Sequence, residues 1–157
     1  MPFFTVTTSF SVNRNEKDRV ASTITELTVN NLKVAPDKVQ VFIQTERKEN
    51  FSRAGALLNN IDFSIASRRT NGLSEDSYFE GIPKKEELII IELDIWRNFS
   101  ISEKSNLGNE ITNFLKEEFQ LIGDNILILI RDMEPANWIQ NGISGIDEDF
   151  LEKSRKA

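Results

Sequence analysis

Two patterns of hydrophobic and polar positions follow one another along the chain, and the whole succession occurs twice. Residues 2–55 superimpose on residues 89–142 at a constant offset of 87 without a gap. In each copy a β-rich stretch comes first, apolar residues three to four positions apart follow, and a second short apolar run closes the unit. The change of period from two to about 3.6 and back predicts a β-α-β unit in each copy.

A helix-start signal precedes each predicted helix. Asn13 is followed three residues later by Glu16, and Ser100 by Glu103, which is the spacing of a capping box. A helix that links two strands implies a crossover, hence parallel strands with the helix on one face. We therefore expect an α+β fold in which two tandem β-α-β repeats form a four-stranded sheet with two helices on one face.

The boundaries of these parts follow from the same patterns. We expect a single domain over residues 1–157, with repeat 1 at 2–57, a connecting segment at 58–86, repeat 2 at 87–145 and a tail at 146–157. The tail is charged, and its only apolar anchors are expected to be Ile146 and Phe150.

The connecting segment divides into two parts. Ile61, Phe63 and Ile65 alternate with polar residues, which predicts a short edge strand. Residues 68–85 are polar and contain Gly72, Gly81 and Pro83, which predicts a loop.

One face of the predicted sheet has no helices to cover it, because the chain has no third layer. Alternate residues of the second strand in each copy lie on that face, namely Gln40, Phe42, Gln44, Leu127, Leu129 and Arg131. The mixture of apolar and polar side chains predicts a surface that meets another subunit and also lines a site.

Composition narrows the chemistry. The chain contains no Cys and no His, so that thiolate and imidazole groups are absent from any catalytic or metal site. Catalysis must then use carboxylates, Lys, Tyr or the chain terminus, and no cofactor and no metal are expected. The 25 acidic and 19 basic residues give a net charge of −6, and the basic residues are dispersed. Neither a nucleic acid nor an anionic membrane is therefore an expected partner.

No segment predicts membrane insertion or secretion. The longest apolar run, Leu88 to Ile91, is far shorter than a membrane span, and the N-terminus lacks the basic and apolar regions of a signal peptide. We therefore expect a cytoplasmic protein.

The start Met1-Pro2-Phe3-Phe4, as the first strand of a duplicated β-α-β unit, resembles the tautomerase superfamily in its fused, two-unit form. The resemblance covers both repeats and is nearest to the malonate semialdehyde decarboxylase and cis-3-chloroacrylic acid dehalogenase families. 4-Oxalocrotonate tautomerase and macrophage migration inhibitory factor are more distant. The resemblance implies an oligomer, for which we expect a homotrimer, with an amino-terminal proline as the catalytic group.

The chemistry of that proline has a physical reason. Once Met1 is removed, Pro2 carries a secondary amine; α-amino groups titrate near about 7.7–8.0, and burial or neighbouring cations lower the pKa further. Such an amine is a usable general base in place of histidine. In the second copy Ile89 stands at the position of Pro2, so only one site per chain can work in this way. The alternative is that Pro2 merely begins an edge strand.

The resemblance implies further site residues. In the decarboxylase family two arginines before the second helix bind the substrate carboxylate; Arg97 matches the first, and Phe99 stands at the second. Arg131 on the uncovered face is a candidate for the missing cation, and an interface ion pair is its alternative role. The family's catalytic aspartate matches Asp37 when a one-residue gap is allowed. Asp124 recurs at the same place in the second copy, which favours a turn residue.

Other positions depart from the related families. Trp138 matches an aromatic residue that walls the pocket in several of them. Gln140 and Leu129 stand where the dehalogenase family has the glutamate and tyrosine that activate water, so dehalogenation is not expected, and Gln140 is a candidate for substrate binding. The short tautomerases have an arginine where this chain has Val12 and Phe99, which disfavours a doubly charged substrate.

Three functions remain open. The leading hypothesis is a cofactor-independent isomerase (tautomerase) that moves a proton between the enol and keto forms of a small 2-oxo monocarboxylate. The first alternative is a decarboxylase or hydratase of a short 3-oxo acid such as malonate semialdehyde, and the second is a non-catalytic trimeric binding module. The expected catalytic residues are Pro2 and Asp37, and the expected substrate-binding residues are Arg97, Arg131, Trp138 and Gln140.

Overall fold

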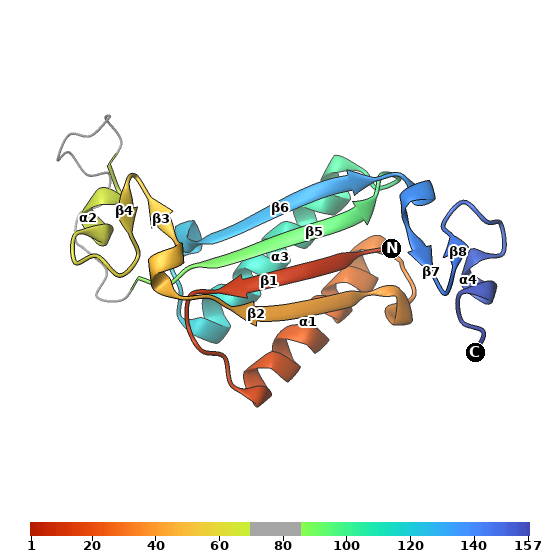
Figure 1. The fold of residues 1–157 in the computed structure, drawn as a ribbon, viewed down its shortest axis with the longest axis horizontal. Coiled ribbons are helices and arrows are strands. Elements are labelled where there is room, and N and C mark those ends of the chain that lie inside the picture. The colour runs from red at the N-terminus through yellow and green to blue at the C-terminus, as the bar shows by residue number, and fades with distance from the viewer. Residues whose placement is uncertain (70–85) are drawn as a thin grey trace.

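The computed structural model describes residues 1–69 and 86–157, and its centre is a four-stranded sheet in the order β2-β1-β5-β6 (Figure 1). The strands are β1 (Phe3–Thr8), β2 (Gln40–Thr45), β5 (Ile89–Trp96) and β6 (Ile126–Met133). β1 is parallel to β2 and β5 is parallel to β6, while β1 and β5 are antiparallel at the centre. The parallel pair predicted for each repeat is therefore confirmed.

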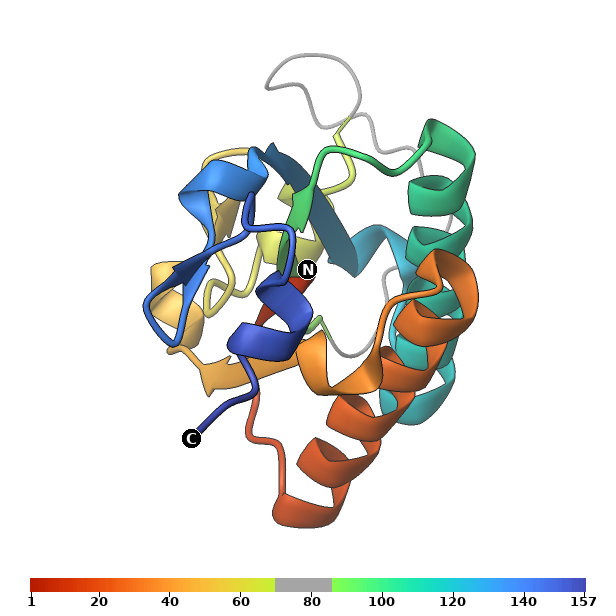
Figure 2. The same cartoon turned by 90° about the vertical axis from the view of Figure 1, so that its right-hand side faces the viewer.

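Two helices of equal length, α1 (Arg14–Leu32) and α3 (Ile101–Phe119), lie side by side on one face of the sheet (Figure 2). Both predicted capping boxes are present. The side chain of Asn13 accepts a hydrogen bond from the Glu16 N–H at 2.9 Å, and the Glu16 carboxylate accepts one from the Asn13 N–H at 2.7 Å. Ser100 and Glu103 make the same reciprocal pair. These bonds satisfy amide groups that the first helical turn leaves without partners.

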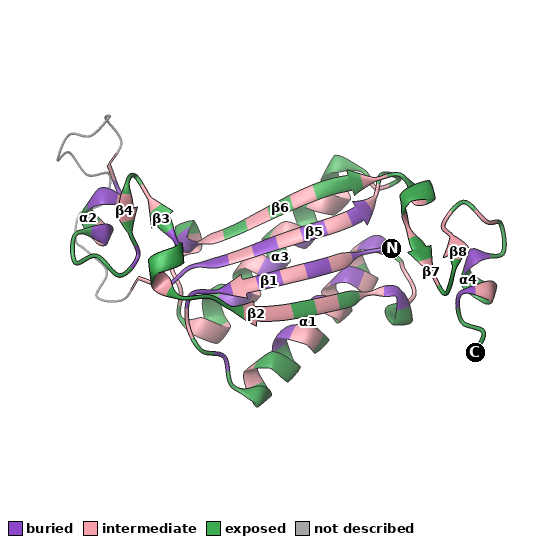
Figure 3. Cartoon of the chain, in the orientation of Figure 1, coloured by how far each residue is buried: buried purple, intermediate pink, exposed green. Residues whose placement is uncertain are grey.

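The hydrophobic core lies between the sheet and the two helices (Figure 3). Every second side chain of β1 and β5 is buried, as expected for strands with one covered face. The helices contribute a matching stripe of fully or almost fully buried residues, namely Val20, Ile24, Leu32, Leu107, Ile111 and Leu115. Each such side chain stabilises the fold by about 1.5–3 kcal/mol relative to an exposed one.

The opposite face of the sheet is exposed in the single chain, as the alternation predicts. Phe42 is 53% exposed, Leu127 47% and Leu129 43%. Figure 3 shows these outer strands as a mixture of exposed and half-buried positions, in contrast to the central strands. The face therefore presents large apolar side chains to its surroundings.

The equivalence of the two repeats continues beyond residue 55. At the same offset of 87, each repeat contains two short 3₁₀ helices (η), a two-stranded hairpin and a final α-helical turn. The 3₁₀ helices are η1 (Pro36–Lys38) and η2 (Lys48–Asn50) in repeat 1, and η3 (Gly123–Asn125) and η4 (Pro135–Asn137) in repeat 2. The hairpin and final turn are β3 (Ser52–Arg53), β4 (Ala56–Leu57) and α2 (Phe63–Ala66) in the first copy, and β7 (Ile139–Gln140), β8 (Ile143–Ser144) and α4 (Phe150–Lys153) in the second. Gly55 and Gly142 adopt positive φ angles at the two hairpin turns. The start of the connecting segment and the tail are thus equivalent parts of the two repeats.

Two expectations for these parts are wrong. The edge strand predicted from Ile61, Phe63 and Ile65 is the helical turn α2, in which Phe63 is buried and Ile65 is exposed. In the tail Phe150 is buried as predicted, but Ile146 is 68% exposed and anchors nothing. The loop predicted for residues 68–85 lies outside the described residues except at its first two positions.

Each closing helical turn docks on the other repeat. Arg155, just after α4, donates two hydrogen bonds to the carboxylate of Asp37 in η1. Arg68, at the equivalent position after α2, contacts Asp124 in η3 at 3.3 Å. The two repeats are therefore linked crosswise at the two ends of the sheet.

Within the described ranges, no helix combines the length and the apolarity that crossing a bilayer requires.

Candidate functional site

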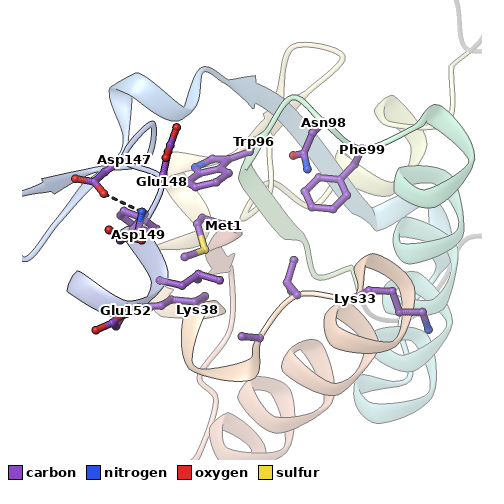
Figure 4. A pocket seen from close by; sticks show the side chains of 15 residues that line it. Met1, Lys33, Lys38, Trp96, Asn98, Phe99, Asp147, Glu148, Asp149 and Glu152 are labelled. Carbon is purple, nitrogen blue, oxygen red and sulfur yellow. Dashed lines mark hydrogen bonds between the residues drawn. The ribbon is translucent and has the colours of Figure 1, made fainter. Parts of the chain in front are cut away.

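A cavity of about 500 Å³ opens at the end of the sheet where the chain begins (Figure 4). Its walls come from the start of the chain, the turn after α1, the end of β5 and the segment from residue 145 through α4. In Figure 4 the Met1 side chain lies among the labelled side chains, between Trp96 and Lys38. Segments distant in sequence thus meet around the first residues of the chain.

Met1 and Pro2, the first two residues of the chain, are both buried. Met1 is only 6% exposed and lines the cavity, and the carbonyl of Pro2 accepts a hydrogen bond from the Gln40 N–H at 3.1 Å. That bond extends the β1–β2 pairing to the first residues and fixes the direction in which the chain starts. Burial lowers the pKa of the Met1 α-amino group from 8.0 to about 6, because a desolvated ammonium is disfavoured. The Met1 α-amino group is therefore largely neutral at pH 7.

Trp96 and Phe150 form the aromatic wall of the cavity, with ring centroids 5.6 Å apart. Gly145 makes room for them: a Cβ at this position would lie 2.5 Å from the Trp96 ring and 2.5 Å from the carbonyl oxygen of Pro135. The indole Nε1 of Trp96 is buried and has no hydrogen-bond partner among the described residues. The wall is thus apolar but includes one unsatisfied donor.

Lys38 is a cavity residue that the sequence analysis missed. It closes η1, is 2% exposed, and donates from Nζ to Ser154 Oγ at 2.9 Å. The Phe150 ring centroid lies 5.8 Å from the same nitrogen. One difference between the repeats could have drawn attention to this residue. The shared aspartates Asp37 and Asp124 are followed by Lys in one copy and by Asn in the other.

The equivalent end of the second repeat is filled. Leu88 stands at the position of Met1, and Leu58 at the position of Gly145. Both are buried in a cluster with Phe51 and Phe63. The cavity therefore exists at one end of the pseudo-symmetric sheet because the chain starts there and because glycine replaces leucine.

Asp37 lies in an ion pair at the edge of this region. Its two carboxylate oxygens accept hydrogen bonds from Arg155 at 2.7 and 2.9 Å, and Oδ2 lies 3.5 Å from Lys38 Nζ. The Arg155 guanidinium and, secondarily, Lys38 hold the pKa of the Asp37 carboxyl at about 2. Such a group is ionised at neutral pH and has its oxygens occupied, which suits docking of the tail better than proton transfer.

The two predicted arginines do not line the cavity of the single chain. Arg97 is exposed and forms an ion pair with Glu134. Arg131 lies on the uncovered sheet face, where it contacts Glu92 and Asp94, each at 2.7 Å. The structure places these guanidinium groups on the surface and pairs each with carboxylates.

Trp138 and Gln140 lie at the β7–β8 hairpin rather than at the cavity. The half-buried Trp138 accepts a hydrogen bond at its carbonyl from the Gly145 N–H at 2.8 Å. The side-chain oxygen of Gln140 is buried and lacks a hydrogen-bond partner in the described part of the chain. Of the expected site residues, the structure therefore brings only the chain start to the cavity, with Asp37 beside it. Over residues 1–69 and 86–157, no group of three or more acidic side chains is arranged to hold a metal ion.

Comparison with known sequences finds no match, either among protein-family models or among curated proteins. Solved structures, in contrast, match over almost the whole chain. A fused 4-OT described as a symmetric trimer, W0, has 13% identity and a TM-score of 0.69 over 92% of this chain and 98% of that chain. Pt0534, solved after inactivation by 2-oxo-3-pentynoate, has 11% identity and a TM-score of 0.68 over 91% and 95%.

A third similar structure is N1, a member of the cis-3-chloroacrylic acid dehalogenase family, with 14% identity and a TM-score of 0.68 over 96% of this chain and 88% of that chain. These likenesses extend over both β-α-β units of the chain. The chain therefore has the fold of the tautomerase superfamily in its fused, two-unit form.

Proposed function

We propose that this protein is a tautomerase-superfamily enzyme in which Pro2, freed by removal of Met1, is the general base for keto-enol tautomerisation of a small 2-oxo monocarboxylate. The observation that carries the proposal is the burial of the chain start at a cavity, where desolvation lowers the pKa of the Met1 α-amino group to about 6; removal of Met1 puts the Pro2 nitrogen at the chain start. An amine of that pKa is mostly neutral at pH 7 and remains basic enough to accept a proton.

The reaction needs one group that both takes and returns a proton. The neutral Pro2 nitrogen accepts the proton of the enol hydroxyl, and the electron pair left on oxygen re-forms the carbonyl as the carbon–carbon double bond breaks. The carbon atom beside the carbonyl takes the proton back from the Pro2 ammonium, which restores the amine. Trp96 and Phe150 exclude water from the apolar part of the substrate.

We propose a homotrimer as the active form. The uncovered sheet face presents Phe42, Leu127 and Leu129 to its surroundings, and an exposed apolar face of this size favours association. Fused 4-OT structures of the same fold are described as trimers. In such an assembly Arg97, Arg131, Trp138 and Gln140, which lie away from the cavity of their own chain, are proposed to serve substrate binding from a neighbouring protomer.

The proposal is tested by the rate at which enolic phenylpyruvate ketonises, after intact-mass measurement has shown that Met1 is absent. Wild type is expected to accelerate the reaction, and Pro2→Ala to reduce kcat/KM by at least about tenfold, because the less basic and more mobile primary amine replaces the ring nitrogen. A chain with Gly-Ser placed before Pro2 is the matched control, since its Pro2 nitrogen is an amide and cannot accept a proton. Equal rates for wild type and this extended chain exclude the proposal.

The decarboxylase alternative needs the opposite protonation state. There Pro2 stays charged and polarises the carbonyl of a 3-oxo acid, with Asp37 assisting. The low pKa at the chain start and the engagement of Asp37 with Arg155 favour the base over this acid. Release of carbon dioxide from malonate semialdehyde, faster with wild type than with the Gly-Ser extension, would instead support decarboxylation. Retention of Met1 in the mature protein would support the binding module.

A further inference from the structure

The cavity contains a buried cation to which the proposed reaction assigns no role. The Lys38 side chain is 2% exposed, although transferring an ammonium from water to a protein interior is costly unless it is paired. Its Nζ donates to the Ser154 hydroxyl at 2.9 Å, which is a neutral acceptor. The nearest carboxylate oxygen, on Asp37, lies 3.5 Å away and is already held by Arg155. An ammonium has three donors, so Lys38 retains capacity to bind a further acceptor.

Comparison of the two repeats shows that the lysine occurs only at the end of the sheet that has the cavity, and not at the filled end. Lys38 and Asn125 occupy equivalent positions and are equally buried, at 2% each. Both polar side-chain atoms of Asn125 have charged partners: its amide nitrogen donates to Glu86, and its oxygen accepts from Arg53 at 3.1 Å. Lys38, in contrast, lines the cavity, and its Nζ has the Ser154 hydroxyl at 2.9 Å and the Asp37 carboxylate at 3.5 Å as its partners. The residue that differs between the repeats is therefore the one that places a charge at the cavity.

A second donor belongs to a residue that lines the same cavity. Trp96 lines it, and the indole Nε1 is buried without a hydrogen-bond partner among the described residues. A buried donor of this kind carries a free-energy cost when nothing accepts its hydrogen bond. An acceptor bound in the cavity would remove that cost.

The acidic side chains at the rim do not compensate Lys38, because basic residues of the same segment pair with them. Lys153 Nζ lies 2.9 Å from Asp147 and 3.5 Å from Asp149, and Lys156 Nζ lies 2.9 Å from Glu152. The rim still includes Glu148, so that the cavity suits one negative charge better than two.

We propose that Lys38 binds the carboxylate of the substrate, with Trp96 Nε1 as an additional donor, and thereby selects 2-oxo monocarboxylates with an apolar tail. The proposal rests on the proposed function for the identity of the substrate, but the binding itself does not depend on catalysis. In this proposal the main contact with the substrate carboxylate is made by a lysine that lines the cavity. Arg97 and Arg131 do not make it, because both form ion pairs with carboxylates on the surface. The apolar tail then lies along Trp96 and Phe150.

The test uses 3-phenylpropionate, which has no keto group to react, and its neutral analogue 3-phenylpropanamide. Isothermal titration calorimetry measures the Kd of each for the processed wild-type protein, Lys38→Met, Lys38→Gln and Lys33→Met. Lys33 is the matched control, because it lies at the same cavity mouth but is exposed and directs its ammonium to the carbonyl of Asn30 (Figure 4). Circular dichroism and the urea midpoint establish that each variant is folded.

Both Lys38 variants are expected to weaken binding of 3-phenylpropionate by about 10- to 100-fold, as for loss of a charge-assisted hydrogen bond, and to leave the Kd of the amide within about threefold. Lys33→Met is expected to bind both compounds as wild type does. Lys38→Gln retains a donor for Ser154, so a loss shared by both variants is due to the charge and not to collapse of the pocket. Unchanged affinity of folded Lys38→Met for the carboxylate overturns the proposal, as does failure of wild type to bind it.

The outcome is separable from that of the proposed function. If carboxylate binding depends on Lys38 and phenylpyruvate is not ketonised, Lys38 remains the anion-binding residue of a non-catalytic cavity and only the tautomerase proposal fails. If ketonisation depends on Pro2 and the KM is the same in wild type and Lys38→Met, the inference about Lys38 fails while the tautomerase proposal stands.

Discussion

Arg155 holds both carboxylate oxygens of Asp37 at 2.7 and 2.9 Å, although 118 positions separate the two residues in the chain. This ion pair links the segment after α4 to the turn before β2, next to Lys38. Its counterpart at the other end of the sheet joins Arg68 to Asp124. Because the same pair of residue types recurs at the offset of 87, the ion pair belongs to the architecture of the repeat.

Arg155→Met is expected to raise the pKa of the Asp37 carboxyl from about 2 towards 3.8, because the guanidinium is the largest cause of its depression. With Arg155 present, Asp37 stabilises the fold above pH 3.8, and this contribution is lost as the pH falls through about 2. Carboxyl-detected NMR titration measures the pKa, and urea unfolding between pH 2 and 4 measures the stability. Arg14→Met, which alters an exposed pair on α1, serves as control; an Asp37 pKa equal in both variants contradicts the assignment.

The α-amino group of a chain that retains Met1 is expected to titrate near pH 6 in the folded protein and near 8.0 when unfolded. The folded state then binds fewer protons than the unfolded state between these values, so stability rises from pH 6 to pH 8, and the burial penalty is complete below pH 6. A ¹³Cα-methionine label follows the titration, and Met133, the other methionine, is the internal reference. A folded-state pKa near 8 would show that the chain start is solvated.

Gly145→Ala is expected to destabilise the protein by about 1–3 kcal/mol, because the added methyl group overlaps the Trp96 ring and the backbone oxygen of Pro135. The matched variant Gly108→Ala changes a glycine within α3 whose Cβ would meet no atom within 4 Å. It should stabilise the protein by about 1 kcal/mol, since alanine is the better helix former. Urea midpoints measure both effects, and shifts of the same sign would contradict the account of the aromatic wall.

Asn13→Ala and Ser100→Ala are each expected to lower the free energy of unfolding by about 0.5–2 kcal/mol through loss of a capping box. Ser105→Ala, at an exposed position within α3, tests whether serine removal alone matters and should be neutral or slightly stabilising. Thermal or urea unfolding gives all three values. Equal effects of Ser100→Ala and Ser105→Ala would mean that the cap contributes nothing measurable.

The sheet and its two helices were accessible from the sequence because their signals are local. Asn13 and Ser100 mark the helix starts, and the apolar periods mark the buried faces. The β-α-β order of each repeat then predicted that its two strands are parallel, since a crossover helix connects parallel strands. The sequence also drew attention to the Met1-Pro2 start, and Met1 lines the cavity; the catalytic role of Pro2 stays a prediction.

The last part of each repeat was missed, although four further identities follow at the same offset: Asp62 and Asp149, Phe63 and Phe150, Ser67 and Ser154, Arg68 and Arg155. The alternation of apolar and polar residues around Phe63 is too short to distinguish a strand from a helical turn. In the structure the segment forms a helical turn that buries the Phe63 ring. Lys38 was missed because the difference between Lys38 and Asn125 at one position of the repeat does not by itself predict burial. Only its long-range contacts with Ser154 and Phe150 explain it.

The crosswise ion pairs have a consequence for how such a chain could have arisen. A half-length ancestor would carry both an Asp37 and an Arg68, on opposite ends of one β-α-β unit, and neither would reach the other. In a dimer of two ancestral copies related by a twofold axis, the arginine of each copy would form an ion pair with the aspartate of the other. Gene fusion would keep both ion pairs within one polypeptide and allow its two ends to differ, as they do where Gly145 corresponds to Leu58 and Lys38 to Asn125.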